Sequence, residues 1–186
     1  MPKAALSFSF ILVPMLLPLP ARAQLSLGLI EKLVQNKFLI AHITWQELQQ
    51  KITSSDSSHY LLFDTRAQEE YQTSHIRSAL RLEPQMPVTE FIKIYGDTLN
   101  GKHAVFYCSV GYRSSIFAER AQQQTLQAGA LSVANLRGGI FRWYNEGNPV
   151  VDAHGETNEI HPYDPFWGVL VRERKKNKNE ELMTKP

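Results

Sequence analysis

The only cysteine of the chain stands where a run of strand-forming residues meets a short loop and a helix. Residues 103–107 read His-Ala-Val-Phe-Tyr, a β-branched and aromatic run that predicts a buried strand. Cys108 ends this run, and the loop after it contains Gly111 and Arg113 before a stretch that can be helical. A strand, a tight loop and a helix N-terminus in this order place a thiol beside backbone N–H groups. This order constrains both the fold and the chemistry of the chain.

Short strands and helices alternate along the middle of the chain. Apolar runs predict strands at 60–63, 103–107 and 130–133, and helices at 45–51, 91–99, 114–127 and 140–145. Residues 75–82 predict a turn that leads into a further brief strand. Strands joined by helices through short loops favour an α/β fold with a mainly parallel central sheet of about five strands, flanked by helices on both faces. Because the carboxyl ends of parallel strands share one edge, Asp64 and Cys108 are expected at that edge.

The segment before this pattern, residues 24–41, predicts an N-terminal amphipathic helix that packs against the domain. The apolar residues at helical spacing are Leu25, Leu29 and Leu33, together with Ile30 and Val34. Thr44, followed three residues later by Glu47, is typical of a capping box and predicts the start of the helix at 45–51.

The residues around Cys108 favour a sulfur anion. A thiol acts as a nucleophile in its thiolate form. Residues 109–114 can turn backbone N–H groups inward, and the helix that follows adds the positive end of its dipole. Gly111 permits a backbone conformation that larger residues resist, and Arg113 can bind an oxyanion through two parallel hydrogen bonds. The loop therefore predicts a reactive Cys108 beneath an anionic substrate.

Four segments carry motifs in a recognisable order. They are Cys108-Ser109-Val110-Gly111-Tyr112-Arg113-Ser114; Asp64-Thr65-Arg66 with Glu69-Glu70-Tyr71; His75-Ile76-Arg77-Ser78-Ala79; and residues 136–143 with Gly147-Asn148-Pro149-Val150. Together these segments resemble the rhodanese family of sulfurtransferases, with Ser78 where glycine is common. The resemblance covers residues 42–152, one domain's length, and implies the α/β fold of that family.

The resemblance implies a sulfurtransferase that moves a sulfane sulfur from a donor such as thiosulfate to a thiophilic acceptor. Cys108 would be the nucleophile and would carry the sulfur as a persulfide. The residues that would bind the substrate are Ser109, Val110, Gly111, Tyr112, Arg113 and Ser114. Asp64 and Arg66 would pair as a scaffold at the floor of the site. The expected partners are a small anionic donor and a cyanide, small-thiol or protein-thiol acceptor, and no cofactor is expected.

Other interpretations remain open for the same residues. Cysteine-dependent phosphatases and arsenate reductases also pair a cysteine with an arginine, but their loop is one residue longer than the four that separate Cys108 from Arg113. The smaller ring suits a sulfur atom better than a phosphate. A non-catalytic domain that carries persulfide, or docks with an exported partner, would also need Cys108. Arg113 can instead pair with an acidic residue on the helix.

The first 23 residues predict export to the periplasm or the exterior. Lys3 supplies a positive charge, residues 6–19 are apolar, and Ala21-Arg22-Ala23 fits the small-x-small cleavage pattern of a signal peptide. The apolar run is short for a membrane span and contains two prolines, so no stable span is expected after cleavage. An uncleaved anchor is the alternative.

Charge and the C-terminal residues narrow the choice of partners. Of 20 basic and 18 acidic residues, two basic ones lie in residues 1–23, so the mature chain would be neutral, which gives no support to a nucleic-acid partner. Residues 153–186 form a polar extension, expected to be partly disordered, with an aromatic patch at 161–167. His154 and His161 match no metal-ligand spacing, so no metal is expected.

Overall fold

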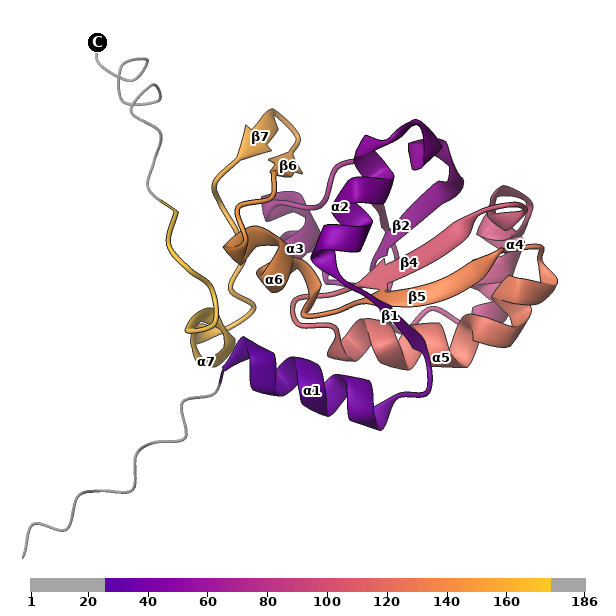
Figure 1. Ribbon diagram of the computed structural model, residues 1–186, viewed down its shortest axis with the longest axis horizontal. Helices are drawn as coiled ribbons and strands as arrows, with labels where there is room; N and C mark the ends of the chain where they lie inside the picture. Colours follow the sequence, from indigo (N-terminus) through magenta and orange to yellow (C-terminus); the bar gives the residue numbers. More distant parts are fainter. Residues whose placement is uncertain (1–25, 175–186) are drawn as a thin grey trace, which may run out of the picture.

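The central sheet of the computed structural model is parallel throughout (Figure 1), and the structure describes residues 26–174. Its strands are β1 (Ala41–Ile43), β2 (Tyr60–Asp64), β3 (Leu80–Arg81), β4 (His103–Tyr107) and β5 (Ser132–Leu136). They lie in the order β1-β5-β4-β2-β3, and every neighbouring pair is parallel. The predicted fold class is therefore confirmed. The predicted signal peptide lies outside the described residues, as does Leu25.

Helices cover both faces of the sheet. They are α1 (Leu27–Lys37), α2 (Trp45–Thr53), the 3-10 turn η1 (Ser55–His59), α3 (Gln68–Thr73), α4 (Val88–Leu99), α5 (Tyr112–Gln127), α6 (Gly139–Asn145) and α7 (Pro165–Gly168). Figure 1 shows α5 along one face and α2 on the other. A small antiparallel hairpin, β6 (Val150–Asp152) and β7 (Gly155–Thr157), follows α6.

The middle strand, β4, is buried because both of its faces are covered. Phe106 of β4 is fully buried and packs among the rings of Phe63, Phe91 and Phe117, with ring centroids 5.0 to 5.8 Å apart. These rings join β2, β4, α4 and α5 into one core. Burial of each such ring contributes roughly 1.5–3 kcal/mol to folding, so the strand that ends at Cys108 is firmly held.

Several predicted boundaries were wrong, whereas one helix start was confirmed. Helix α4, for example, begins at Val88 and not at residue 91. Thr44 and Glu47 form the predicted capping box at the start of α2. Helix α5 starts at Tyr112, two residues before the predicted start, because Gly111 takes a left-handed conformation (φ 92°) and caps it. The strand expected at 130–133 is β5, which begins at Ser132 because the glycine turn before it extends further than expected.

The face that the N-terminal helix turns to the domain was predicted only in part. Leu29 and Leu33 are 46% and 58% exposed. Ile30 and Val34 are buried as predicted, and the residues buried beside them are Leu27 and Glu31. Glu31 explains this orientation, because its carboxylate accepts hydrogen bonds from Arg142 Nε at 2.5 Å and Arg137 Nε at 3.2 Å. Periodicity of leucines could not reveal an inward-facing carboxylate.

The first turn of α6 fixes the Cys108 loop. The N–H of Ile140 donates to the Cys108 carbonyl at 2.8 Å, and the N–H of Phe141 donates to the Ser109 carbonyl at 3.0 Å. Gly139 makes this approach possible, since a Cβ there would lie 2.7 Å from the Ser109 carbonyl oxygen. Its φ of 57° also favours glycine. The loop and the first turn of α6 are therefore one packed unit.

We expect Gly139→Ala to lower the free energy of unfolding by about 2–5 kcal/mol, because left-handed strain and a backbone clash add. Gly147→Ala is the matched control: its φ is 86°, but a Cβ there meets nothing within 4 Å. The control should lose only about 1–2 kcal/mol. Urea denaturation of both variants measures the difference, and equal losses would contradict the close packing at Gly139.

Candidate active site

The thiol of Cys108 lies at the carboxyl end of β4 and is 1% exposed. Its Sγ accepts a hydrogen bond from the backbone N–H of Gly111 at 3.2 Å. Gly111 is the N-cap of α5, a helix of 16 residues whose positive end therefore begins beside the sulfur. The backbone and the helix both favour negative charge on this atom.

The strand next to β4 holds the same loop from the other side. The hydroxyl and N–H of Thr65, just after β2, both donate to the Tyr107 carbonyl, at 3.1 and 2.9 Å. Two neighbouring segments thus bind the backbone on either side of Cys108: residue 65 before it and residues 140–141 after it. The position of the sulfur is set by the backbone.

Arg113 is bound by a carboxylate from α3. Its Nη1 and Nη2 donate to the two oxygens of Glu70 at 2.8 and 2.7 Å, and Nη2 also donates to the Ser109 hydroxyl at 2.9 Å. The Ser109 hydroxyl in turn donates to Glu70 at 2.9 Å. Arg113 therefore pairs with an acid from another helix, and the network links the loop to α3.

The ionisation of this pair follows from its contacts. Burial raises the pKa of Glu70. The hydrogen bonds and charge of Arg113, together with hydrogen bonds from the Ala67 amide and the Ser109 hydroxyl, lower this pKa by more than burial raises it, so the pKa lies below its ordinary value. Burial lowers the pKa of Arg113, whereas hydrogen bonds to Glu70 and the nearby Cys108 sulfur raise it, and the net effect is a raised pKa. Both groups are charged at neutral pH.

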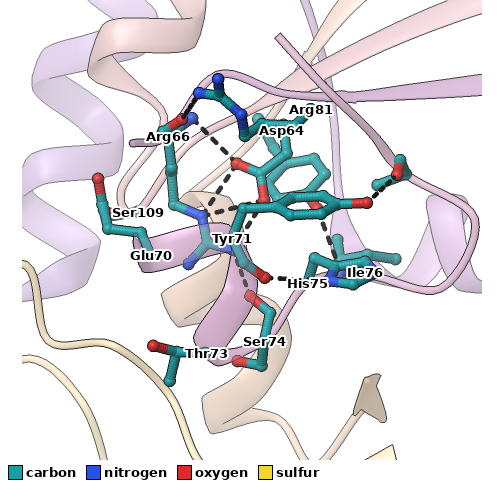
Figure 2. Close-up of polar contacts among 12 residues, drawn as sticks. Asp64, Arg66, Glu70, Tyr71, Thr73, Ser74, His75, Ile76, Arg81 and Ser109 are labelled. Atoms are coloured by element: carbon teal, nitrogen blue, oxygen red, sulfur yellow. Dashed lines mark hydrogen bonds and ion pairs between the residues drawn. The ribbon is translucent and has the colours of Figure 1, made fainter. Parts of the chain in front are cut away.

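Asp64 and Arg66 form a second ion pair, which is fully buried. Arg66 Nε lies 2.9 Å from Asp64 Oδ1, and Nη2 lies 2.7 Å from Oδ2 (Figure 2). The same Nη2 donates to the Ser74 carbonyl at 2.5 Å. Arg66 precedes α3 and Ser74 follows it, so this ion pair joins the two ends of the helix that carries Glu70. Neither Asp64 nor Arg66 lines the cavity described below.

Above the sulfur lies a cavity of about 420 Å³. Of the loop residues singled out from the sequence, Cys108, Ser109, Val110, Tyr112 and Arg113 line it. Ser114 does not: it is fully buried, and its hydroxyl donates to Asn135 at 2.6 Å, which ties α5 to β5. Gly111 contributes through its N–H to the sulfur.

Sequence reasoning missed the other walls of this cavity. They come from α1 and the C-terminal segment: Ile30, Leu33, Val34, Lys37, Tyr163 and Trp167. The Arg113 guanidinium carbon lies 4.7 Å from the Tyr163 ring centroid, a cation–π contact. The aromatic patch at 161–167 was the available signal for this wall, as the motif containing Glu70 was for the partner of Arg113.

The part of the chain that the structure describes contains neither a cluster of metal ligands nor a helix that could span a membrane. Within residues 26–174, no three His, Cys, Asp or Glu side chains gather in a way that could hold a metal ion. Among the helices of the same residues, none combines the length and apolar character needed to cross a membrane.

We expect Glu70→Gln to lower the free energy of unfolding at pH 7 by roughly 1–3 kcal/mol, because charge-assisted hydrogen bonds to Arg113 are lost. Folding depresses the Glu70 pKa below 4.5, so its stabilisation is complete above pH 4.5 and disappears as the pH falls through the depressed value. Denaturation curves from pH 7 to pH 3 should therefore converge for wild type and variant.

The matched control for this series is Glu69→Gln, an exposed neighbour on α3. Its stability should differ from wild type by less than about 0.5 kcal/mol. A deficit in Glu70→Gln that stays constant down to pH 3 would contradict the ion-pair assignment.

The chain is similar in sequence to known proteins, and it covers the whole of one of them but only a part of another. A sulfurtransferase of Allochromatium vinosum is 31% identical over 117 residues, which cover 63% of this chain and 100% of that protein. A probable molybdopterin-synthase adenylyltransferase of Porphyra purpurea is 35% identical over 101 residues, 53% of this chain. The chain spans only 24% of that second relative.

Among solved structures, a thiosulfate sulfurtransferase from Pseudomonas aeruginosa matches 68% of this chain and 22% of its own, with a TM-score of 0.51 and 21% identity. This likeness shows the shared fold. Residues 44–146 match the family described as the rhodanese-like domain. With the Allochromatium relative, this match supports sulfurtransferase-type activity at the level of the family. The chain belongs to the family of rhodanese-like domains.

Proposed function

We propose that this protein is a sulfurtransferase that moves a sulfane sulfur from a donor such as thiosulfate to a thiophilic acceptor through a persulfide on Cys108. The observation that carries the proposal is the position of Sγ: it lies at a cavity, accepts the Gly111 N–H and adjoins the positive end of α5. A terminal sulfur anion bonded to Sγ would extend into the same cavity.

The proposed reaction has two displacement steps. The Cys108 thiolate attacks the outer sulfur of the donor, a new S–S bond forms, and the donor's S–S bond breaks, so that sulfite leaves with the electron pair. The acceptor, a cyanide, small thiol or protein thiol, then attacks the terminal sulfur of the persulfide. The Cys108 thiolate leaves with the electrons of that bond and is regenerated.

The site favours both anionic states of the sulfur. Burial alone would oppose a negative sulfur, but the Gly111 N–H, the helix end and the Arg113 charge act in the opposite direction. The carbonyls of Cys108 and Ser109 are bound by α6. Glu70 fixes Arg113 beside the sulfur without itself lining the cavity. These groups would need little rearrangement during either step.

The phosphatase alternative has less support. In a cysteine-dependent phosphatase the loop arginine must bind the phosphate of the substrate. In this chain the Arg113 guanidinium instead donates to Glu70 and Ser109. Among the described residues that line the cavity, none is a carboxylic acid that could protonate a leaving group. A non-catalytic persulfide carrier would share Cys108, and turnover with a small acceptor distinguishes it from an enzyme.

We expect the purified protein to transfer sulfur from thiosulfate to cyanide, and Cys108→Ser to abolish this transfer, because the serine hydroxyl is a far weaker sulfur nucleophile. Thiocyanate formation measures the turnover, and intact mass spectrometry should show one added sulfur atom on wild type alone. Ser132→Ala, a substitution at the start of β5, is a control that should retain activity. Activity that persists in Cys108→Ser would refute the mechanism.

We also propose that residues 1–23 direct export and are then removed, on the basis of the charged, apolar and small-x-small pattern. The full chain, expressed in a bacterium with two membranes, should appear in the periplasmic fraction with the mass of residues 24–186. Ala23→Tyr should block cleavage, because the cleavage site requires a small residue. Recovery of only uncleaved protein in the cytoplasm would contradict export.

A further inference from the structure

The cavity over Cys108 is roofed by parts of the chain outside the family match. That match covers residues 44–146, whereas α1 supplies Ile30, Leu33 and Val34, and the C-terminal segment supplies Tyr163 and Trp167. Both segments are anchored. Glu31 joins α1 to Arg137 and Arg142, and Arg174, at the end of the described chain, donates to the Tyr144 and Asn148 carbonyls. The roof is therefore a built wall of the site.

The wall is apolar in a way that a small inorganic anion does not require. Its side chains are aliphatic or aromatic, and one of them, Leu33, is 58% exposed at the cavity. A volume of about 420 Å³ falls within the roughly 300–1,000 Å³ of sites that hold organic ligands. Thiosulfate would fill only part of this space and would leave the apolar walls in contact with water.

Two cations lie on the same cavity as the apolar wall. Lys37 donates to the Tyr112 hydroxyl at 2.7 Å, and its Nζ lies 4.8 Å from the centre of that ring. Arg113 is committed to Glu70 by two hydrogen bonds, but it keeps its charge close to the sulfur. A ligand that matches this cavity carries one anionic group and an apolar body.

We propose that this cavity selects an organic sulfane-sulfur donor in which an apolar group bears the sulfur-containing anion, an aryl thiosulfonate being the simplest example. The inference rests on the proposed function and specifies the substrate class of the same site. The apolar group would lie against Leu33 and Trp167, and the anionic end would reach Cys108 between Lys37 and Arg113.

The transfer from such a donor balances without a further reactant. The Cys108 thiolate attacks the terminal sulfur of ArSO2S⁻, and an S–S bond forms between them. The bond between that sulfur and the sulfonyl sulfur breaks, and the sulfinate ArSO2⁻ leaves with the electron pair. One negative charge enters with each reactant, and one leaves on each product. Lys37 lines the same cavity, and its positive charge would favour the departing sulfinate.

The test compares two donors with the same reacting group, benzenethiosulfonate and methanethiosulfonate, which differ in their apolar part. The measured quantity is the ratio of their kcat/KM values for sulfur transfer to cyanide. We expect Trp167→Ala to lower the ratio by about 10-fold or more and Leu33→Ser by about 3-fold, since apolar contact contributes to such discrimination on this scale.

Leu29→Ser is the matched control, because Leu29 is also exposed on α1 but does not line the cavity. It should leave the ratio at the wild-type value. An unchanged ratio in Leu33→Ser and Trp167→Ala, or an equal fall in Leu29→Ser, would overturn the selection while sulfur transfer itself continued. Failure of every donor, thiosulfate included, to add sulfur to Cys108 would overturn the proposed function and this inference with it.

Discussion

The backbone hydrogen bonds between the Cys108 loop and α6 are the constraint on which the site depends. The N–H groups of Ile140 and Phe141 bind the carbonyls of Cys108 and Ser109. Carbonyl oxygens left free beside a sulfur anion would repel it, whereas in this arrangement they are bound by another element and the Gly111 N–H is left for Sγ. Gly139 makes this arrangement possible, because the absence of a side chain allows the backbone of α6 to approach the backbone of the Cys108 loop.

Two ion pairs then order the side chains around the loop, one behind the other. Asp64 and Arg66 are completely buried, and their contact with the Ser74 carbonyl holds both ends of α3. Glu70 lies on that helix and binds Arg113 near the sulfur. A buried pair of this kind costs desolvation energy and is costly to break, so its value here lies in placing Glu70. Arg113 in turn keeps a positive charge beside the sulfur in a defined orientation.

The N-terminal and C-terminal segments give the chain a site that the central domain would not have alone. Helix α1 is oriented by the buried carboxylate of Glu31, which brings Leu33 to the cavity and leaves Leu29 outside it. Tyr163 lines the same cavity and makes a cation–π contact with Arg113. Any ligand in this cavity thus meets residues that lie far apart in the chain.

The sequence alone determined the features that local patterns encode. Apolar runs between glycine turns predict a parallel sheet, and the run at 103–107 became the central strand β4, with Cys108 at its end. The loop motif, its glycine and the capping box at Thr44 are likewise local, since each depends on residues within one turn of chain. Only the tertiary structure decided that Glu70 holds Arg113, that Ser114 turns to Asn135, and that Tyr163 covers the site. The physical reason is that periodicity reports the environment of a residue along its own helix or strand. Pairing of charges and closure of a cavity depend instead on which distant segments packing brings together.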